Sequence, residues 1–192
     1  MKQVFRSKLA WVFGWAWVIF AAWNAWDLIV RGSMPSALIA GAVLGVITLL
    51  VGLLALRPAI IPEEGGVRIR NPFRNAYVPW SSVDEVQVSN AIVIVAGDTS
   101  IRCWSPQPSA RERAKAVRRA GRQQARSSQL PDSAAQAVLG RTHADWVAQQ
   151  LLEMAVLRKR DASGTTSVSW SPVALAAVAA AVVLVVVTFV LV

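Results

Sequence analysis

Basic residues between positions 109 and 126 form the densest cluster of groups in this chain that could bind a ligand. Five of them recur at spacings of four, three, four and four residues, which would place them on one face of a helix. Each basic side chain near an anionic membrane surface contributes about 1 kcal/mol of attraction. We therefore expect contact with anionic lipid headgroups or with an acidic partner protein, and a solvated charged loop is the competing interpretation. The residues assigned to this contact are Arg111, Lys115, Arg118, Arg119, Arg122 and Arg126.

The rest of the chain lacks the residue combinations that catalysis, metal binding or base recognition requires. His143 is the only histidine and Cys103 the only cysteine, so no internal disulfide can form, and one histidine cannot build a metal site without partners at suitable spacing. No P-loop, GxGxxG or GxSxG pattern occurs. No aromatic side chains alternate with the basic segment to stack on bases, which makes nucleic acid the least favoured partner. We expect a non-enzymatic protein that uses no cofactor and no metal.

Long apolar segments lie before and after the basic segment in the chain and must hold it in position. The chain of 192 residues is 55% hydrophobic and only 16% charged, yet its net charge is +9, which is unusual for a soluble globule. The apolar residues concentrate in segments 9–30, 37–56 and 173–192, each long enough to cross a hydrocarbon core of about 30 Å. We expect Asp27, near the end of the first segment, to form an interfacial ion pair with Arg31 rather than to carry protons.

The first apolar segment also permits a second interpretation. A basic start followed by residues 9–23 is typical of a secretory signal peptide. Five tryptophans between Trp11 and Trp26 and the lack of a well-placed small-x-small cleavage site favour a membrane-spanning helix instead, because tryptophan prefers the membrane interface.

Small residues on the second apolar segment indicate close helix packing. Glycine and threonine at such spacing let two helices approach closely. Packing against the first helix is the favoured interpretation, and dimerisation or docking against another membrane protein is the alternative. The residues concerned are Gly41, Gly45, Thr48 and Gly52.

The basic residues that flank the apolar segments predict an orientation. Arg31 is alone at one end of the helices, and the other end carries Lys2, Arg6, Lys8, Arg57, Arg68, Arg70, Arg74, Arg158, Lys159 and Arg160. Basic flanks remain in the cytoplasm. We therefore expect a cell-membrane protein whose N-terminus (1–8) and polar domain are cytoplasmic and whose C-terminus lies outside.

Residues 57–160 have the pattern of a small α+β domain. Short strand-like segments at 59–62, 67–70, 76–80, 83–88, 92–96 and 99–104 are separated by turn residues, which predicts an antiparallel meander. Residues 142–160 predict a closing amphipathic helix with an apolar stripe that includes Val147, Leu151 and Leu157. Residues 105–141 are a basic insertion, and 161–172 are expected to be a linker.

Three motifs within this domain resemble a known family. The stretches 66–74 (GVRIRNPFR), 78–83 (VPWSSV) and 101–104 (IRCW) are similar to the bacterial PH-like domain of membrane-anchored proteins common in actinobacteria. The resemblance implies an antiparallel β-barrel or sandwich closed by a C-terminal helix, often preceded by two hydrophobic helices, and it implies no established biochemical function. Phosphoinositide binding through the first strand connection is not transferred to this chain, because that turn carries Glu63 and Glu64, which would repel a phosphate.

These patterns together predict an α+β membrane protein with three transmembrane helices and one PH-like domain. We expect a scaffold or accessory subunit of a membrane protein complex at the cytoplasmic face, whose partners are membrane lipids and a membrane protein or a second copy of the chain. The alternative is an autonomous module that binds anionic lipid headgroups through residues 111–126.

Overall fold

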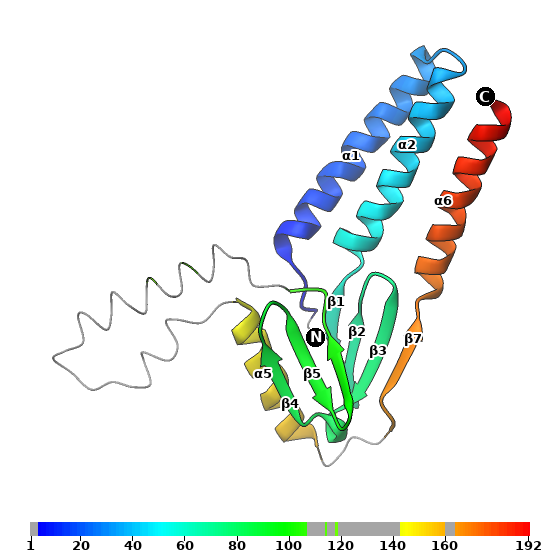
Figure 1. Cartoon of the computed structure of the whole chain (residues 1–192). Helices are drawn as coiled ribbons and strands as arrows, with labels where there is room; N and C mark the ends of the chain where they lie inside the picture. The colour runs from blue at the N-terminus through cyan, green and yellow to red at the C-terminus, as the bar shows by residue number, and fades with distance from the viewer. Residues whose placement is uncertain (1–3, 107–113, 115–117, 119–142, 160–163) are drawn as a thin grey trace.

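Three long helices stand above a small β domain in the computed structural model of this chain (Figure 1). The structure describes residues 4–106, 114, 118, 143–159 and 164–192. The long helices are α1 (Lys8–Arg31), α2 (Ser36–Val51), which continues as a π-helical turn over Gly52–Leu56, and α6 (Pro172–Leu191). Each is long and apolar enough to cross a membrane, so the expectation of three such helices is confirmed.

Local side-chain contacts define the ends of these helices. Ser7 precedes α1 and its Oγ accepts a hydrogen bond from the amide of Ala10, and Ser171 caps α6 in the same way through the amide of Ala174. At the far end of α1, Arg31 and Asp27 form the expected ion pair, with 3.5 Å between nitrogen and oxygen. The connection after Arg31 and the C-terminus lie at the end of the helices away from the β domain (Figure 1).

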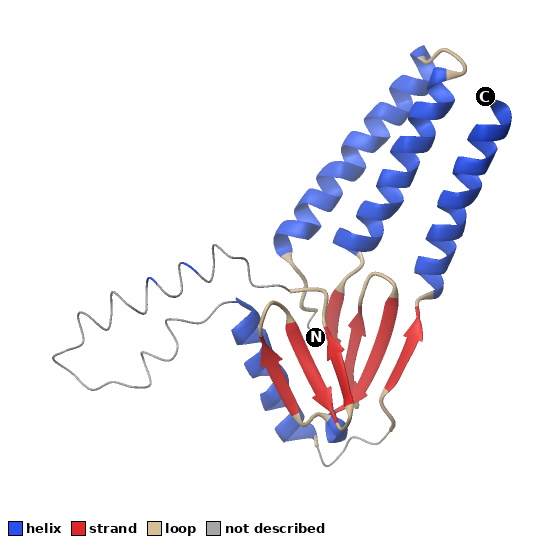
Figure 2. Cartoon of the chain, in the orientation of Figure 1, coloured by secondary structure: helices blue, strands red, loops and turns tan. Residues whose placement is uncertain are grey.

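The described residues of the β domain form seven short strands in two antiparallel sheets (Figure 2). The first sheet has the order β1-β2-β3-β7 and the second the order β4-β5-β6. A single 3-10 turn at Trp80–Ser82 joins β3 to β4. The strands are β1 (Ala59–Pro62), β2 (Gly66–Arg70), β3 (Arg74–Pro79), β4 (Glu85–Val88), β5 (Ile92–Ala96), β6 (Thr99–Arg102) and β7 (Ser167–Trp170).

Both sheets and helix α5 (His143–Arg158) share one apolar core. Strand alternation explains the inner faces, since in β2 Val67 and Ile69 are buried while Arg68 and Arg70 are exposed. The buried face of α5 differs from the expected stripe, because Leu157 is 80% exposed and small residues take its place against the sheets. That face consists of Ala144, Val147, Ala148, Leu151 and Ala155.

The β domain is not a closed barrel, which corrects that part of the expected fold class. The free edge of β1 does not pair with the second sheet. It pairs instead with Phe5, whose backbone exchanges two hydrogen bonds of 2.8 Å with Ile60. The Phe5 ring is buried and meets Trp146 of α5 edge to face, with 6.0 Å between ring centroids. The N-terminal residues therefore supply backbone hydrogen bonds to the edge of β1. In a closed barrel, that edge would pair with another strand of the domain.

The expectation that 161–172 is only a linker is wrong for part of that segment. Ser167–Trp170 forms β7, which pairs with β3 in the register Arg74↔Trp170 and Tyr77↔Ser167. All four residues of β7 are exposed, as suits an edge strand with little apolar surface to bury. β7 leads directly into α6 through Ser171, so the sheet and the third long helix are continuous in the chain.

Candidate functional site

The predicted basic contact surface lies almost entirely outside the described residues. Arg118 is described and is exposed. The helical face and its ligand therefore remain predictions. The assigned residues outside the described part of the chain are Arg111, Lys115, Arg119, Arg122 and Arg126.

The predicted packing residues of α2 contact two different helices. Thr48 Oγ1 accepts a hydrogen bond of 3.1 Å from the indole nitrogen of Trp17 in α1. Gly45 faces α6, where an added methyl group would lie 2.6 Å from Cδ2 of Leu184. A methyl group at Gly41 or Gly52 would meet no atom within 4 Å. Of the four residues, Thr48 therefore contacts α1, Gly45 contacts α6, and Gly41 and Gly52 face open space.

Three junctions fix the β domain to one end of the long helices, which we call the helix-proximal end of the domain. In the first, the amide of Ser7 donates to Ser105 Oγ at 2.8 Å, just before α1 begins. In the second, Arg57 follows α2 and bonds to the turn between β2 and β3. In the third, the amide of the fully buried Ser171 donates to the carbonyl of Phe73 at 2.9 Å, just before α6. Each long helix therefore has its own attachment to the domain.

Arg57 forms the most extensive of these junctions. Its Nη1 donates to the carbonyl oxygens of Asn71 and Pro72, the latter at 2.9 Å, and its Nη2 donates to Asn75 Oδ1 at 2.6 Å. Burial, and to a smaller extent the positive charge of Arg70, lower the pKa of the Arg57 guanidinium. Sequence reasoning counted Arg57 only as a flanking charge, and no local pattern marks its long-range role.

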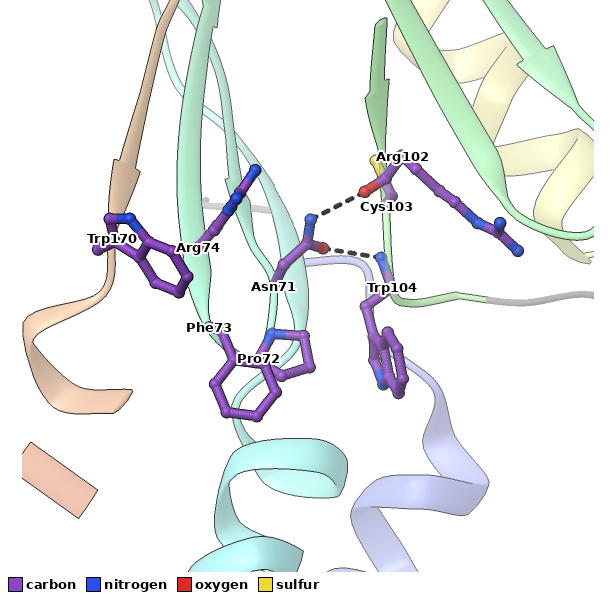
Figure 3. A pocket seen from close by; sticks show the side chains of 8 residues that line it. All are labelled: Asn71, Pro72, Phe73, Arg74, Arg102, Cys103, Trp104 and Trp170. Carbon is purple, nitrogen blue, oxygen red and sulfur yellow. Dashed lines mark hydrogen bonds between the residues drawn. The ribbon is translucent and has the colours of Figure 1, made fainter. Parts of the chain in front are cut away.

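An aromatic groove of about 630 Å³ opens at the helix-proximal end between the two sheets. Asn71 bridges the sheets there, because its amide donates to the carbonyl of Arg102 and its oxygen accepts from the amide of Trp104, both at 2.8 Å. Figure 3 shows Pro72, Phe73 and Trp104 on the side of the groove nearest the helices. The groove is lined by Asn71, Pro72, Phe73, Arg74, Arg102, Cys103, Trp104 and Trp170.

Both aromatic and cationic side chains line this groove. The Arg74 guanidinium lies 4.9 Å from the ring centroid of Trp170, a cation–π contact. The indole nitrogen of Trp104 donates to the carbonyl of Leu54 near the end of α2, at 3.2 Å. Phe73, Trp104 and Trp170 are each about half exposed. Tryptophan at the end of an apolar helix is the arrangement typical of a membrane interface.

A second hollow, the basic crevice, lies between α2 and α6 where they approach the β domain, with a volume of about 650 Å³. Its wall on the domain side carries Arg57, Arg68 and Arg70 with Asn75. Its helical walls are mainly apolar and include Leu53 and Val173. The crevice is therefore cationic at one end and apolar at the other, and sequence reasoning missed it because its two helical walls come from segments more than 100 residues apart.

His143 and Cys103 are the remaining side chains that were considered for chemistry, and their surroundings indicate structural roles. His143 stacks on Trp146 with 5.8 Å between ring centroids, at the start of α5. Cys103 is fully buried, and that burial raises the pKa of its thiol to about 12. No group of three His, Cys, Asp or Glu side chains is placed to hold a metal among the residues that the structure describes. The basic crevice, with its cationic wall and its apolar walls, is the arrangement suited to holding an anion that carries an apolar group.

Comparisons with protein-family models, with curated proteins and with solved structures find no match to this chain.

Proposed function

We propose that this chain is a non-enzymatic, membrane-anchored scaffold or accessory subunit that holds a PH-like domain at the cytoplasmic face of a membrane protein complex. The observation that carries the proposal is the set of three junctions, because each long helix is bonded separately to the domain. A domain held in this way presents a fixed face to the membrane and to neighbouring proteins. An enzyme or a freely moving lipid sensor has no evident need for three such attachments.

Two observations support the PH-like and membrane-bound parts of the proposal. Two antiparallel sheets that share a core with one helix follow the plan that the motif resemblance implies, apart from the open edge at β1 and the strand β7, which follows α5. The helices α1, α2 and α6 have the length and apolarity of membrane spans, and exposed aromatic residues lie where they meet the domain.

We expect the β domain to be cytoplasmic and Val192 to lie outside. The domain is at one end of all three helices, and the basic flanks are concentrated at that same end (Figure 1). A reporter that is active only outside the cytoplasm, fused after Val192, should be active, and the same reporter fused after Gly32 should also be active. Activity of a cytoplasm-specific reporter at either position would contradict this orientation.

A stoichiometric membrane partner is the expected result of co-purification. The tagged full chain is expressed at its native level, extracted in mild detergent and analysed by mass spectrometry. Before lysis, these cells are mixed with isotope-labelled cells that lack the tag. A genuine partner should be an integral membrane protein that is recovered in a fixed ratio and only in unlabelled form. Recovery of the chain alone, or only as a homodimer, would contradict the accessory-subunit proposal.

A further inference from the structure

We infer that the basic crevice between α2 and α6 binds one anionic phospholipid, with its phosphate at Arg57 and Arg70 and an acyl chain between the helices. The inference requires the membrane anchoring of the proposed function, but it requires no protein partner. It differs from the predicted contact through residues 111–126 in its site and in its residues.

The strand register explains how the two cations come together. Arg70 of β2 lies opposite Asn75 of β3, and both are on the outer face of the first sheet. Arg57 arrives from the end of α2 and donates to Asn75 Oδ1 at 2.6 Å. Asn75 therefore holds the Arg57 side chain next to Arg70, on the side of the sheet that faces the crevice.

Among the residues that the structure describes, the charge of this pair is not balanced by an acidic group. The partners to which Arg57 donates within the described part of the chain are neutral carbonyl oxygens, those of Asn71, Pro72 and the Asn75 side chain. No carboxylate forms an ion pair with Arg57 or Arg70 within residues 4–106, 143–159 and 164–192. Arg68 in the same wall differs, because it donates to both oxygens of Glu63 at 2.7 and 3.1 Å. Two neighbouring guanidinium groups without an acid, one of them partly buried, form a site for an anion.

The other walls of the crevice identify the kind of anion. They are formed by the final turns of α2 and the first turns of α6, including Leu49, Leu53, Val173 and Ala177. Both helices have the length and apolarity of membrane spans. A small soluble anion would leave these apolar walls uncovered, whereas a phospholipid places a phosphate and an acyl chain next to each other as the crevice requires. Charge complementarity and position therefore favour a phospholipid over an acidic protein segment.

Lipid binding to the full chain can be measured directly by native mass spectrometry. The purified chain in neutral detergent is titrated with dioleoylphosphatidylglycerol or with dioleoylphosphatidylcholine, which differ in headgroup charge and have the same acyl chains. We expect one phosphatidylglycerol to bind at least about tenfold more tightly than phosphatidylcholine, because only the former keeps a net negative charge near both arginines. Equal binding of the two lipids would overturn the inference.

Charge variants test whether the two arginines form a local site. R57Q/R70Q should weaken phosphatidylglycerol binding at least about tenfold. R74Q/R102Q is the matched control, since it removes the same charge from the same end of the domain but outside the crevice. The control should change the affinity less than about twofold. An equal loss in both double variants would show diffuse electrostatic attraction and would overturn the assigned site.

A second pair of variants tests the acyl-chain part without changing any charge. Gly52 lines the crevice and has open space beside it, so Gly52→Leu should fill the apolar end and reduce lipid binding by a similar factor. Gly41 also faces open space but lies outside the crevice, so Gly41→Leu should bind as the parent does. This pair keeps the inference testable if the loss of Arg57 prevents folding. Unchanged binding by Gly52→Leu would contradict the placement of the acyl chain.

Discussion

Trp80→Ala is expected to lower the free energy of unfolding of the β domain by about 3–5 kcal/mol. The Trp80 side chain is fully buried in the core that the two sheets and α5 share. Its indole nitrogen donates to the carbonyl of Glu63 at 3.0 Å, so truncation also removes this hydrogen bond, although the same carbonyl still accepts from Arg158 at 3.2 Å. Domains are typically stable by only about 5–15 kcal/mol, so this loss removes a large share of that stability.

The measurement is the resistance of the full chain to proteolysis in detergent with increasing urea. Cleavage within the β domain should occur at clearly lower urea for Trp80→Ala than for the parent. Trp170→Ala is the matched control, because Trp170 is 59% exposed and its main contact is Arg74, which limits the expected loss to about 1 kcal/mol or less. Similar losses in both variants would contradict the central position of Trp80 in the core.

Four basic residues after α2 show what sequence patterns can and cannot predict about this site. By sequence, Arg57, Arg68, Arg70 and Arg74 are all flanking charges that indicate orientation. In the structure Arg57 bonds to the β2–β3 turn, Arg68 pairs with Glu63, Arg70 faces the crevice and Arg74 stacks on Trp170. These roles depend on which segments fold against each residue, and such long-range contacts leave no mark in local spacing.

Some strands of the β domain can be predicted from local sequence, whereas others depend on long-range pairing. β2 lies where alternating apolar and charged residues predict it, because one face of the strand is buried, and β1 and β5 lie where short apolar runs between turn residues predict strands. β7 was missed because its residues are exposed and its stability comes from pairing with β3. Its alternation of Ser167, Val168, Ser169 and Trp170 was the available signal. The pairing of Phe5 with Ile60 has no comparable signal, since a single residue shows no periodicity.

The basic crevice exists because the junctions attach both α2 and α6 to the turn between β2 and β3. Arg57 attaches α2 to the β2–β3 turn. Ser171 attaches α6 to Phe73, which is the last residue of the same turn before β3 begins. Both attachments bring the ends of α2 and α6 to one edge of the first sheet, where Arg70 is exposed. A lipid bound there would contact both helices and the domain at once, and it would therefore strengthen the fixed placement on which the proposed scaffold function depends.

Alkaline pH is expected to destabilise the β domain through Cys103. Burial raises the pKa of this thiol to about 12 in the folded protein, whereas its ordinary value is 9.0. Below pH 9 the thiol is protonated in both states and has no effect on the pH dependence. Between about pH 9 and 12 the unfolded chain loses the proton while the folded protein keeps it. The free energy of unfolding should therefore fall by about 1.4 kcal/mol for each pH unit in this range.

Cys103→Ala separates this effect from the titration of lysine and tyrosine, which also lose protons at high pH. Urea unfolding of the parent and of the variant is monitored by proteolysis at several pH values between 8 and 11. The difference in unfolding free energy between the two proteins should shrink steadily above pH 9. Below pH 9 that difference should be constant, because it reflects only the packing of the sulfur atom in the core. A constant difference across the whole range would mean that the Cys103 thiolate is accommodated in the folded domain, and the assigned cause of the raised pKa would then be wrong.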